Sequence, residues 1–333
     1  DLQPALTPEE KLALAKEAEE AALTSDARIT NSEGAEFSNA AREILYANSL
    51  GFCDTYRTTS FSLSVVPVAS QNGSMQRDYW YSSHRKLNGL EAAKTIGQKA
   101  ADRTLRRLGA KQVKTQEAPV IFEPEMAASL LRHLAGAVCG SSLYRKTSFL
   151  LDKIDQKIAA NGIFIEDNAR IPSALGSKPF DGEGLPTRQT MVVEDGVLKS
   201  YLLDSYSARK LGLQSTGNAS RSFADAPSAS PSNLFFRPGT TTPEEIIRSV
   251  QSGLYVTELS GFGVNPITGD YSRGAVGLWI ENGELTYPVE EITIAGNLLD
   301  MFQNIELVGN DLERRGAISA PTLKISRMTI AGA

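Results

Sequence analysis

The chain has 333 residues, of which 41% are hydrophobic and 22% are charged, a balance typical of a folded protein with one or more sizeable cores. Its net charge of −5 argues against a nucleic-acid-binding role, because phosphate recognition needs concentrated lysine and arginine. Its two cysteines are too few for a disulfide framework, and no apolar run reaches the ~20 residues of a membrane span. No signal peptide is visible at the start, so we expect a cytoplasmic protein.

Two segments carry the same helix-start signature. TPEE occurs at 7–10 and again at 242–245, with threonine at the N-cap, proline at the first helical position and glutamate at N3. The threonine hydroxyl and the glutamate carboxylate can then accept hydrogen bonds from amides that the first helical turn leaves free. We therefore expect a helix after each threonine. Further helices are predicted at 90–108, 124–139, 143–159 and 294–303.

Strands are indicated by their turns. Asn-Gly or Asp-Gly lies between β-prone runs at 71–74, 194–197 and 281–284. These dipeptides tolerate the positive φ angles of a type I′ turn and are a strong hairpin signal. A closing strand is predicted at 321–330, and the Ser-, Pro- and Gly-rich stretch 215–245 is expected to be a linker or a functional loop. The pattern predicts an α+β fold with antiparallel sheets, and it argues against a parallel nucleotide-binding sheet.

The predicted helix 124–139 contains His133, one of only two histidines. A catalytic zinc site needs three protein ligands, and short zinc motifs place two histidines and a glutamate on one helical face. No second histidine and no glutamate follow His133 within two turns, and His84 lies far upstream. Met126, Leu130 and Ala137 share its face at helical spacing, which favours a packing role for His133 over a ligand role.

Other catalytic signatures are absent from the sequence. No G-x-S-x-G elbow occurs, and Asp54 beside Cys53 would disfavour a thiolate. The glycines of GFGVNPITGD lack the third glycine of a dinucleotide-binding fingerprint and are not followed by a helical pattern.

Two acidic, glycine-rich stretches remain as candidate sites. Residues 178–190 carry Asp181 and Glu183, and residues 261–284 carry Asp270 and Arg273 after the glycines at 261 and 263. A carboxylate pair could perform acid–base chemistry, but aspartate and glycine are also common turn residues. Closely spaced glycines let a backbone approach another chain, so contact with a peptide or a partner is the better functional interpretation. The residues assigned to that contact are Asp181, Glu183, Gly261, Gly263, Asp270 and Arg273.

Long motifs in these stretches resemble the TldD/PmbA family, once named modulators of DNA gyrase. They are SSLYRKTSFLLD, KPFDGEGLPTRQT, YLLDSYSARKLGLQSTGNA, NPITGDYSRGAVGLWIENGELTYPVEEITIAGNLLDMFQNI and VGND, and the resemblance runs from about residue 28 to the end. It implies a two-domain fold, with the remainder of an N-terminal α/β domain at 1–115 and a β-rich C-terminal domain at 116–333. Family members usually have further residues before the point at which this sequence starts.

The family has two branches. TldD-like members carry an HExxxH motif and act as zinc metallopeptidases, whereas PmbA-like members, also called TldE, lack it and pair with a TldD-like partner. HLAGAV at 133–138 aligns His133 with the first histidine, but Leu134 replaces the glutamate and Val138 replaces the second histidine. The sequence therefore resembles the PmbA/TldE branch, and no metal or catalytic role transfers to it.

The resemblance implies a subunit of a cytosolic heterodimeric peptidase that processes unfolded or modified peptides, with zinc in the TldD-like partner. Two alternatives stay open. One is a non-catalytic homodimeric protein that binds peptides, and the other is an independent hydrolase that uses Asp181 and Glu183. Co-purification with an HExxxH-bearing partner would favour the heterodimeric peptidase over the homodimer. Activity that persists in EDTA would favour the independent hydrolase.

Overall fold

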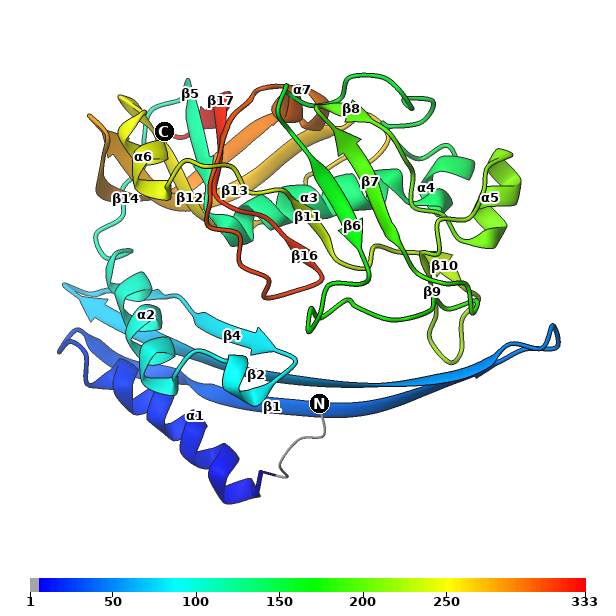
Figure 1. Cartoon of the computed structure of the whole chain (residues 1–333). Coiled ribbons are helices and arrows are strands. Elements are labelled where there is room, and N and C mark those ends of the chain that lie inside the picture. The colour runs from blue at the N-terminus through cyan, green and yellow to red at the C-terminus, as the bar shows by residue number, and fades with distance from the viewer. Residues whose placement is uncertain (1–5) are drawn as a thin grey trace. The chain divides into compact units, whose positions relative to one another are not determined.

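The computed structural model describes residues 6–333, and its chain forms two compact units (Figure 1). The first unit comprises the residues up to Leu45 together with Thr55–Lys111, and the second comprises Tyr46–Asp54 with Gln112–Ala333. No helix among the described residues is long and apolar enough to cross a bilayer.

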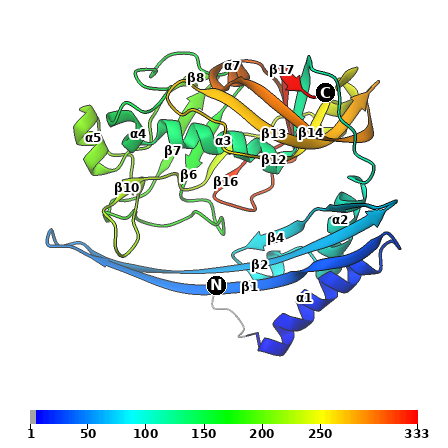
Figure 2. The same cartoon turned by 180° about the vertical axis from the view of Figure 1, so that it is seen from behind.

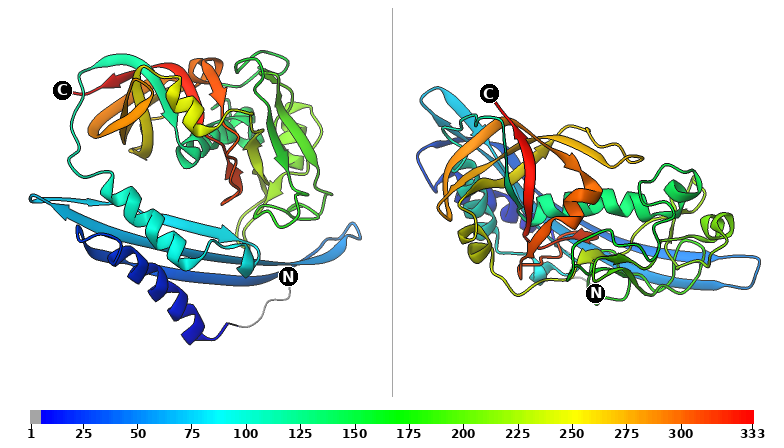
Figure 3. Two further views of the ribbon diagram at one scale, coloured as in Figure 1. Left: turned by 60° about the vertical axis from the view of Figure 1, so that its left-hand side comes forward. Right: turned by 90° about the horizontal axis from the view of Figure 1, so that it is seen from above.

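The first unit is an antiparallel sheet with two helices on one face. Strand β2 pairs with β1, β3 and β4. Every second residue of β2 from Phe61 to Val65 is buried, as a strand with one covered face requires. These residues pack with α1 and α2, which cross so closely that a Cβ on Gly97 would lie 2.2 Å from the Ala18 carbonyl oxygen. Figure 3 shows both helices beside the long β1–β2 hairpin. The elements are α1 (Pro8–Leu23), β1 (Ile29–Ala47), β2 (Cys53–Gln71), β3 (Ser74–Arg77), β4 (Trp80–His84), η1 (Leu87–Gly89) and α2 (Ala93–Leu105).

The second unit is built on a sheet of six strands that closes on itself. The strand order is β14-β13-β12-β5-β17-β15, and β14 also pairs with β17. Most pairings are antiparallel, whereas β12 and β5 run parallel. Figure 2 shows β12, β13 and β14 together near α3. The elements of this part are β5 (Gln116–Phe122), β12 (Ser252–Ser260), β13 (Asp270–Glu281), β14 (Glu284–Asn297), α7 (Leu298–Gln303), β15 (Ile305–Val308) and β17 (Leu323–Ala331).

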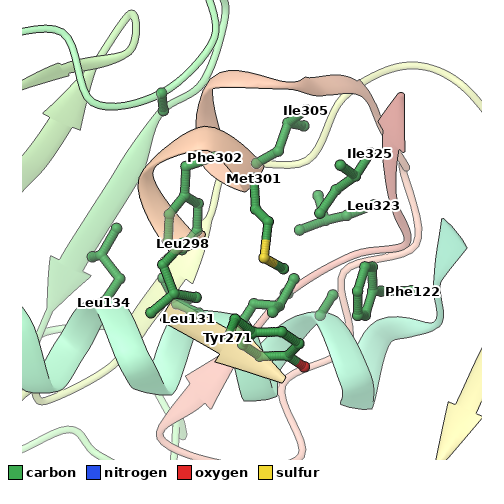
Figure 4. Packing of buried hydrophobic residues seen from close by; sticks show 14 of the residues in the cluster. Phe122, Leu131, Leu134, Tyr271, Leu298, Met301, Phe302, Ile305, Leu323 and Ile325 are labelled. Carbon is green, nitrogen blue, oxygen red and sulfur yellow. The ribbon is translucent and has the colours of Figure 1, made fainter. Parts of the chain in front are cut away.

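A second sheet and the remaining helices complete this unit. The sheet has the order β16-β11-β6-β7-β8, and β9 pairs with β10 separately. Helix α3 contacts strands of both sheets, so its apolar residues lie in the main core (Figure 4). The elements are α3 (Pro124–Val138), α4 (Gly140–Tyr144), β6 (Ile165–Asn168), β7 (Gln189–Glu194), β8 (Val197–Leu198), α5 (Ser205–Leu211), β9 (Ala219–Ser220), β10 (Ser228–Ala229), β11 (Leu234–Phe236), α6 (Pro243–Arg248) and β16 (Ile318–Ser319).

The local signals of the sequence are mostly confirmed. Both capping boxes form, with Thr7 and Thr242 accepting from the N3 amides. The three hairpin turns have positive φ at both central residues, as a type I′ turn requires. The α+β fold with mainly antiparallel sheets is also confirmed. The stretch 215–245 is not a linker, because it contains β9, β10 and β11 and lies within the second unit.

The helix predicted at 143–159 is wrong. Only α4, at its start, is helical, and the following chain turns repeatedly with positive φ at Lys146, Asp152 and Asp155. Tertiary hydrogen bonds outweigh helix propensity here, since the Tyr201 hydroxyl donates to the Leu150 carbonyl at 2.7 Å. The helix predicted at 294–303 begins later, because β14 continues to Asn297.

Candidate functional site

Helix α3 places His133 at the border of its buried stripe. The imidazole is half-buried, and its Nε2 atom has no hydrogen-bond partner among the described residues. Its ring lies edge-on to Tyr271 of β13, with 6.0 Å between the ring centres. Burial lowers the pKa of His133, and the Arg273 and Arg132 guanidinium groups lower it further. The positive charges of Arg273 and Arg132 also disfavour a metal dication beside this imidazole.

Leu134 and Val138, the residues at the two motif positions considered after His133, belong to the core. Leu134 and Val138 are fully buried, and Figure 4 shows Leu134 near Leu298 and Phe302 of α7. In the part of the chain that the structure describes, no three histidine, cysteine, aspartate or glutamate residues gather as metal ligands. A zinc ion needs at least three such ligands, so the donor set around His133 does not fit one.

Cys139 follows α3 directly, but it offers no thiolate. The side chain is buried, and burial first, then the Asp167 and Asp204 carboxylates, raise the pKa of the thiol to about 12. A protonated thiol is a poor nucleophile and a poor metal ligand.

Tyr271 and Arg273 lie on the same face of β13, because side chains alternate along a strand. Tyr271 is buried in the core, and burial raises the pKa of its hydroxyl, an effect that the nearby Arg273 guanidinium opposes. Arg273 donates to the Leu259 carbonyl at 3.1 Å, to the Ser260 carbonyl at 3.3 Å and to the Ser129 hydroxyl at 3.1 Å. Arg273 thus ties the end of β12 to α3, and it forms no ion pair with Asp270.

The glycine-rich loop between β12 and β13 borders a hollow of about 610 Å³, bounded by residues 262–266 and 270–272. The loop is held by its own backbone, since the Ser272 amide donates to the Gly263 carbonyl at 2.7 Å and the Asn265 amide to the Asp270 carbonyl at 2.9 Å. Asp270 accepts from the Thr268 hydroxyl at 2.6 Å. The Phe262 side chain is fully exposed. The loop therefore offers an ordered backbone and an open aromatic ring to a ligand.

The two glycines of this loop have different reasons to be glycine. A Cβ on Gly263 would lie 2.0 Å from the Ser272 carbonyl oxygen, so no larger residue fits without moving backbone. Gly261 has φ +80°, and a Cβ there would meet nothing within 4 Å. The backbone at Gly261 is accordingly open on that side.

Asp181 and Glu183 lie in a different loop and have structural partners. The Asp181 carboxylate is buried and accepts from the amides of Glu183 and Leu185 at 2.9 Å and of Ala219 at 3.0 Å. Glu183 accepts from the Ser205 amide at 2.9 Å, at the start of α5. This geometry favours the turn role that the sequence left open for both residues. No hydrogen bond or ion pair among the described residues joins them to Asp270 or Arg273.

Sequence reasoning did not find Ser129, Tyr271 or Phe262 as members of this region. Tyr271 stands two positions before Arg273, so the alternation of side chains along β13 places both on one face, but the sequence predicted no strand at these positions. Ser129 stands four positions before His133, at the spacing that places two residues on one helical face. The exposure of Phe262 depends on the loop conformation and had no sequence signal.

The second unit thus combines a glycine-rich loop with a helix, α3, whose residues after His133 pack into the core. Two family models match almost the whole chain, the PmbA/TldA metallopeptidase central domain over residues 1–108 and the corresponding C-terminal domain over residues 115–332. The chain belongs to the PmbA/TldD metallopeptidase family.

Similar proteins agree with this assignment. The metalloprotease PmbA of Escherichia coli O157:H7 is 44% identical over 98% of this chain and 71% of its own length. The metalloprotease TldD homolog of Buchnera aphidicola is 28% identical over 90% of this chain and 67% of its own length.

Solved structures share the fold. A proposed modulator of DNA gyrase from Bacteroides thetaiotaomicron superposes with a TM-score of 0.91 at 32% identity, over 98% of this chain and 72% of that one. TldE from Thermococcus kodakarensis superposes with a TM-score of 0.90 at 24% identity, over 98% and 75%, and shows likeness in fold.

Proposed function

We propose that this chain is the PmbA/TldE-like subunit of a cytosolic peptidase complex, in which a TldD-like partner holds the zinc and the catalytic groups. The observation that supports this most directly is the complete burial of Leu134 and Val138. A glutamate that activates water and a second histidine ligand would have to stand at these positions. Both side chains instead fill the core, so α3 supplies packing rather than chemistry.

The part that we assign to this chain is to hold an extended peptide. Gly261 leaves backbone open to solvent, and Phe262 offers an exposed ring beside the hollow. Extended peptides commonly bind by main-chain hydrogen bonds, with pockets that select a few side chains. An unfolded or modified peptide exposes the main chain that such a surface needs, and a folded protein does not.

Assembly and metal content test this proposal together. The chain should be expressed alone and with a TldD-like partner, purified by size exclusion, and assayed for zinc by elemental analysis and for cleavage of an extended peptide. We expect a heterodimer with about one zinc, consistent with a single closed set of ligands plus water, and no stoichiometric zinc in the chain alone. About one zinc in the isolated chain, removed by His133→Ala, would overturn the proposal.

Homodimers that never join the partner would instead support the non-catalytic peptide-binding alternative. Peptide cleavage by the chain alone, retained in EDTA, would support an independent hydrolase. Asp181→Asn is a further check on the independent hydrolase. If the Asp181 carboxylate has only a structural role, this variant should lose stability while its rate constant for cleavage stays unchanged.

A further inference from the structure

Helices α4 and α5 form a basic, aromatic surface on the second unit. They lie side by side in the views of Figures 1 and 2, and the rings of Tyr144 and Tyr206 meet edge to face with 5.5 Å between centres. Two cations directly follow α4, and two lie in the last turn of α5. We call the following residues the α4–α5 surface: Tyr144, Arg145, Lys146, Tyr206, Arg209 and Lys210.

The tyrosine rings hold cations at this surface. The Arg145 guanidinium lies 5.6 Å from the centre of the Tyr144 ring, and the Lys210 ammonium lies 5.5 Å from that of Tyr206. Such cation–π contacts order a long side chain and leave its charge available to solvent and ligands. Tyr206 is 46% exposed, so the surface combines open aromatic area with positive charge.

No acidic side chain neutralises this charge locally. The sequence has no aspartate or glutamate in residues 140–151 or 205–224. None of the four cations forms an ion pair in the described part of the chain. At the start of α5, the opposite end from Arg209 and Lys210, the Asp204 carboxylate accepts from the Ser207 amide and the Glu183 carboxylate accepts from the Ser205 amide.

We propose that the α4–α5 surface docks an acidic peptide that contains a run of aspartate or glutamate. Arginine forms bidentate pairs with carboxylates, lysine adds unpaired donors, and exposed tyrosines contribute apolar area to such contacts. A nucleic acid fits less well, because four cations neutralise few phosphates and the remaining surface is negatively charged overall.

This docking role goes beyond the proposed subunit function, because it needs neither zinc nor a TldD-like partner. It also differs from the loop beside Phe262, where an extended main chain is held through backbone and an aromatic ring. An acidic segment bound on α4 and α5 would raise the local concentration of the rest of its chain near this unit.

Binding to the chain alone tests the proposal. The probe is a fluorescein-labelled peptide of about ten glutamates, titrated by fluorescence anisotropy at low and at physiological ionic strength, since exposed charge pairs are screened by salt. The variant Arg209→Gln/Lys210→Gln removes two cations of the surface. The matched control Lys16→Gln/Lys94→Gln removes two exposed cations of the first unit that have no ion pair among the described residues.

We expect saturable, salt-sensitive binding that weakens about tenfold in the Arg209/Lys210 variant, as the loss of two surface ion pairs predicts. The control should change less than about twofold by the same reasoning. Arg145→Gln/Lys146→Gln should repeat the loss, which guards against a folding defect in one variant.

Three outcomes would overturn the proposal: absence of saturable binding, an equal loss in the control variant, or tighter binding of a single-stranded oligothymidylate of about the same charge. Failure here leaves the subunit proposal intact, because complex formation and zinc content are measured separately.

Discussion

Helix α3 and the loop between β12 and β13 lie close together in the second unit, yet they have opposite structural character. On α3, the positions where metallopeptidase relatives are expected to carry a glutamate and a histidine hold Leu134 and Val138, both fully buried. In the loop, Gly261 faces open space and Phe262 is fully exposed. Arg273 links the two regions through Ser129 and the β12 carbonyls.

The two regions place different demands on the sequence. Catalytic side chains on α3 would place polar groups in the buried core, which is unfavourable unless each forms a hydrogen bond. Apolar side chains at these positions avoid that penalty. The loop needs only backbone geometry, which glycines and internal hydrogen bonds supply. Substitutions in the two regions should therefore fail in different ways.

The largest expected effect is the loss of stability when a glutamate replaces Leu134 on α3. Leu134→Glu places a carboxylate in the core without a partner, and we expect a loss of about 4 kcal/mol or more in the free energy of unfolding. Denaturant unfolding at neutral pH measures it. Gly136→Glu on the same helix is the control, because a side chain there meets open space. Equal stability of Leu134→Glu and wild type would show that this face of α3 is not core.

A smaller stability effect with a functional consequence is expected in the loop. Gly263→Ala forces a Cβ against the Ser272 carbonyl, and we expect a loss of about 1–3 kcal/mol. With a TldD-like partner present, its KM for an extended peptide should rise several-fold while kcat changes little. Gly261→Ala has space but an unfavourable φ, so about 1 kcal/mol should be lost. An unchanged KM in both variants would show that the loop does not bind the peptide.

Gly283 lies outside the loop between β12 and β13 and serves as a control for the loop variants. Gly283 has φ +80° in the β13–β14 turn, and its Cβ would lie 2.9 Å from Arg248 backbone atoms. Gly283→Val should lower the free energy of unfolding by about 1–2 kcal/mol, since a β-branched residue resists positive φ. KM for the peptide should not change. A KM increase equal to that of Gly263→Ala would mean that stability, rather than the loop, controls binding.

The smallest expected effect is electrostatic. The pKa of His133 in the folded chain lies below its ordinary value of 6.5, first through burial and then through Arg273 and Arg132. Below pH 6.5 the unfolded chain binds a proton that the folded chain does not, so His133 lowers stability as pH falls toward its folded pKa. NMR titration of the imidazole should show the low pKa, and Arg132→Gln should raise it. A pKa at or above 6.5 in wild type would contradict the assigned environment.

Local signals made much of the fold predictable from the sequence. Threonine caps, Asn-Gly turns and the apolar stripe of α3 act over a few residues, so their outcomes depend little on the rest of the chain. The stretch 143–159 failed because Leu150 and its neighbours bond to residues distant in sequence, such as Tyr201. The long β1–β2 hairpin was not predicted, because the burial pattern of β1 is irregular and lacks the regular alternation of a strand with one covered face.

The candidate site was predictable where residue identity decided it. Leu134 and Val138 cannot act as ligands in any conformation, whereas the roles of Asp181 and Arg273 depended on neighbours brought by the fold. The Ala219 amide that donates to Asp181 and the β12 carbonyls that accept from Arg273 come from residues at least 13 positions away. Sequence alone therefore left both the turn role and the contact role open.

We propose that this chain supports proteolysis without supplying a catalytic group, and the decisive variant is His133→Ala in the complex with a TldD-like partner. Steady-state cleavage of an extended peptide should be measured beside size exclusion of the same preparations. We predict that kcat and KM stay within about twofold of wild type. A change of about twofold corresponds to less free energy than the loss of one ion pair or hydrogen bond. Loss of kcat with assembly intact would make His133 catalytic and contradict this account.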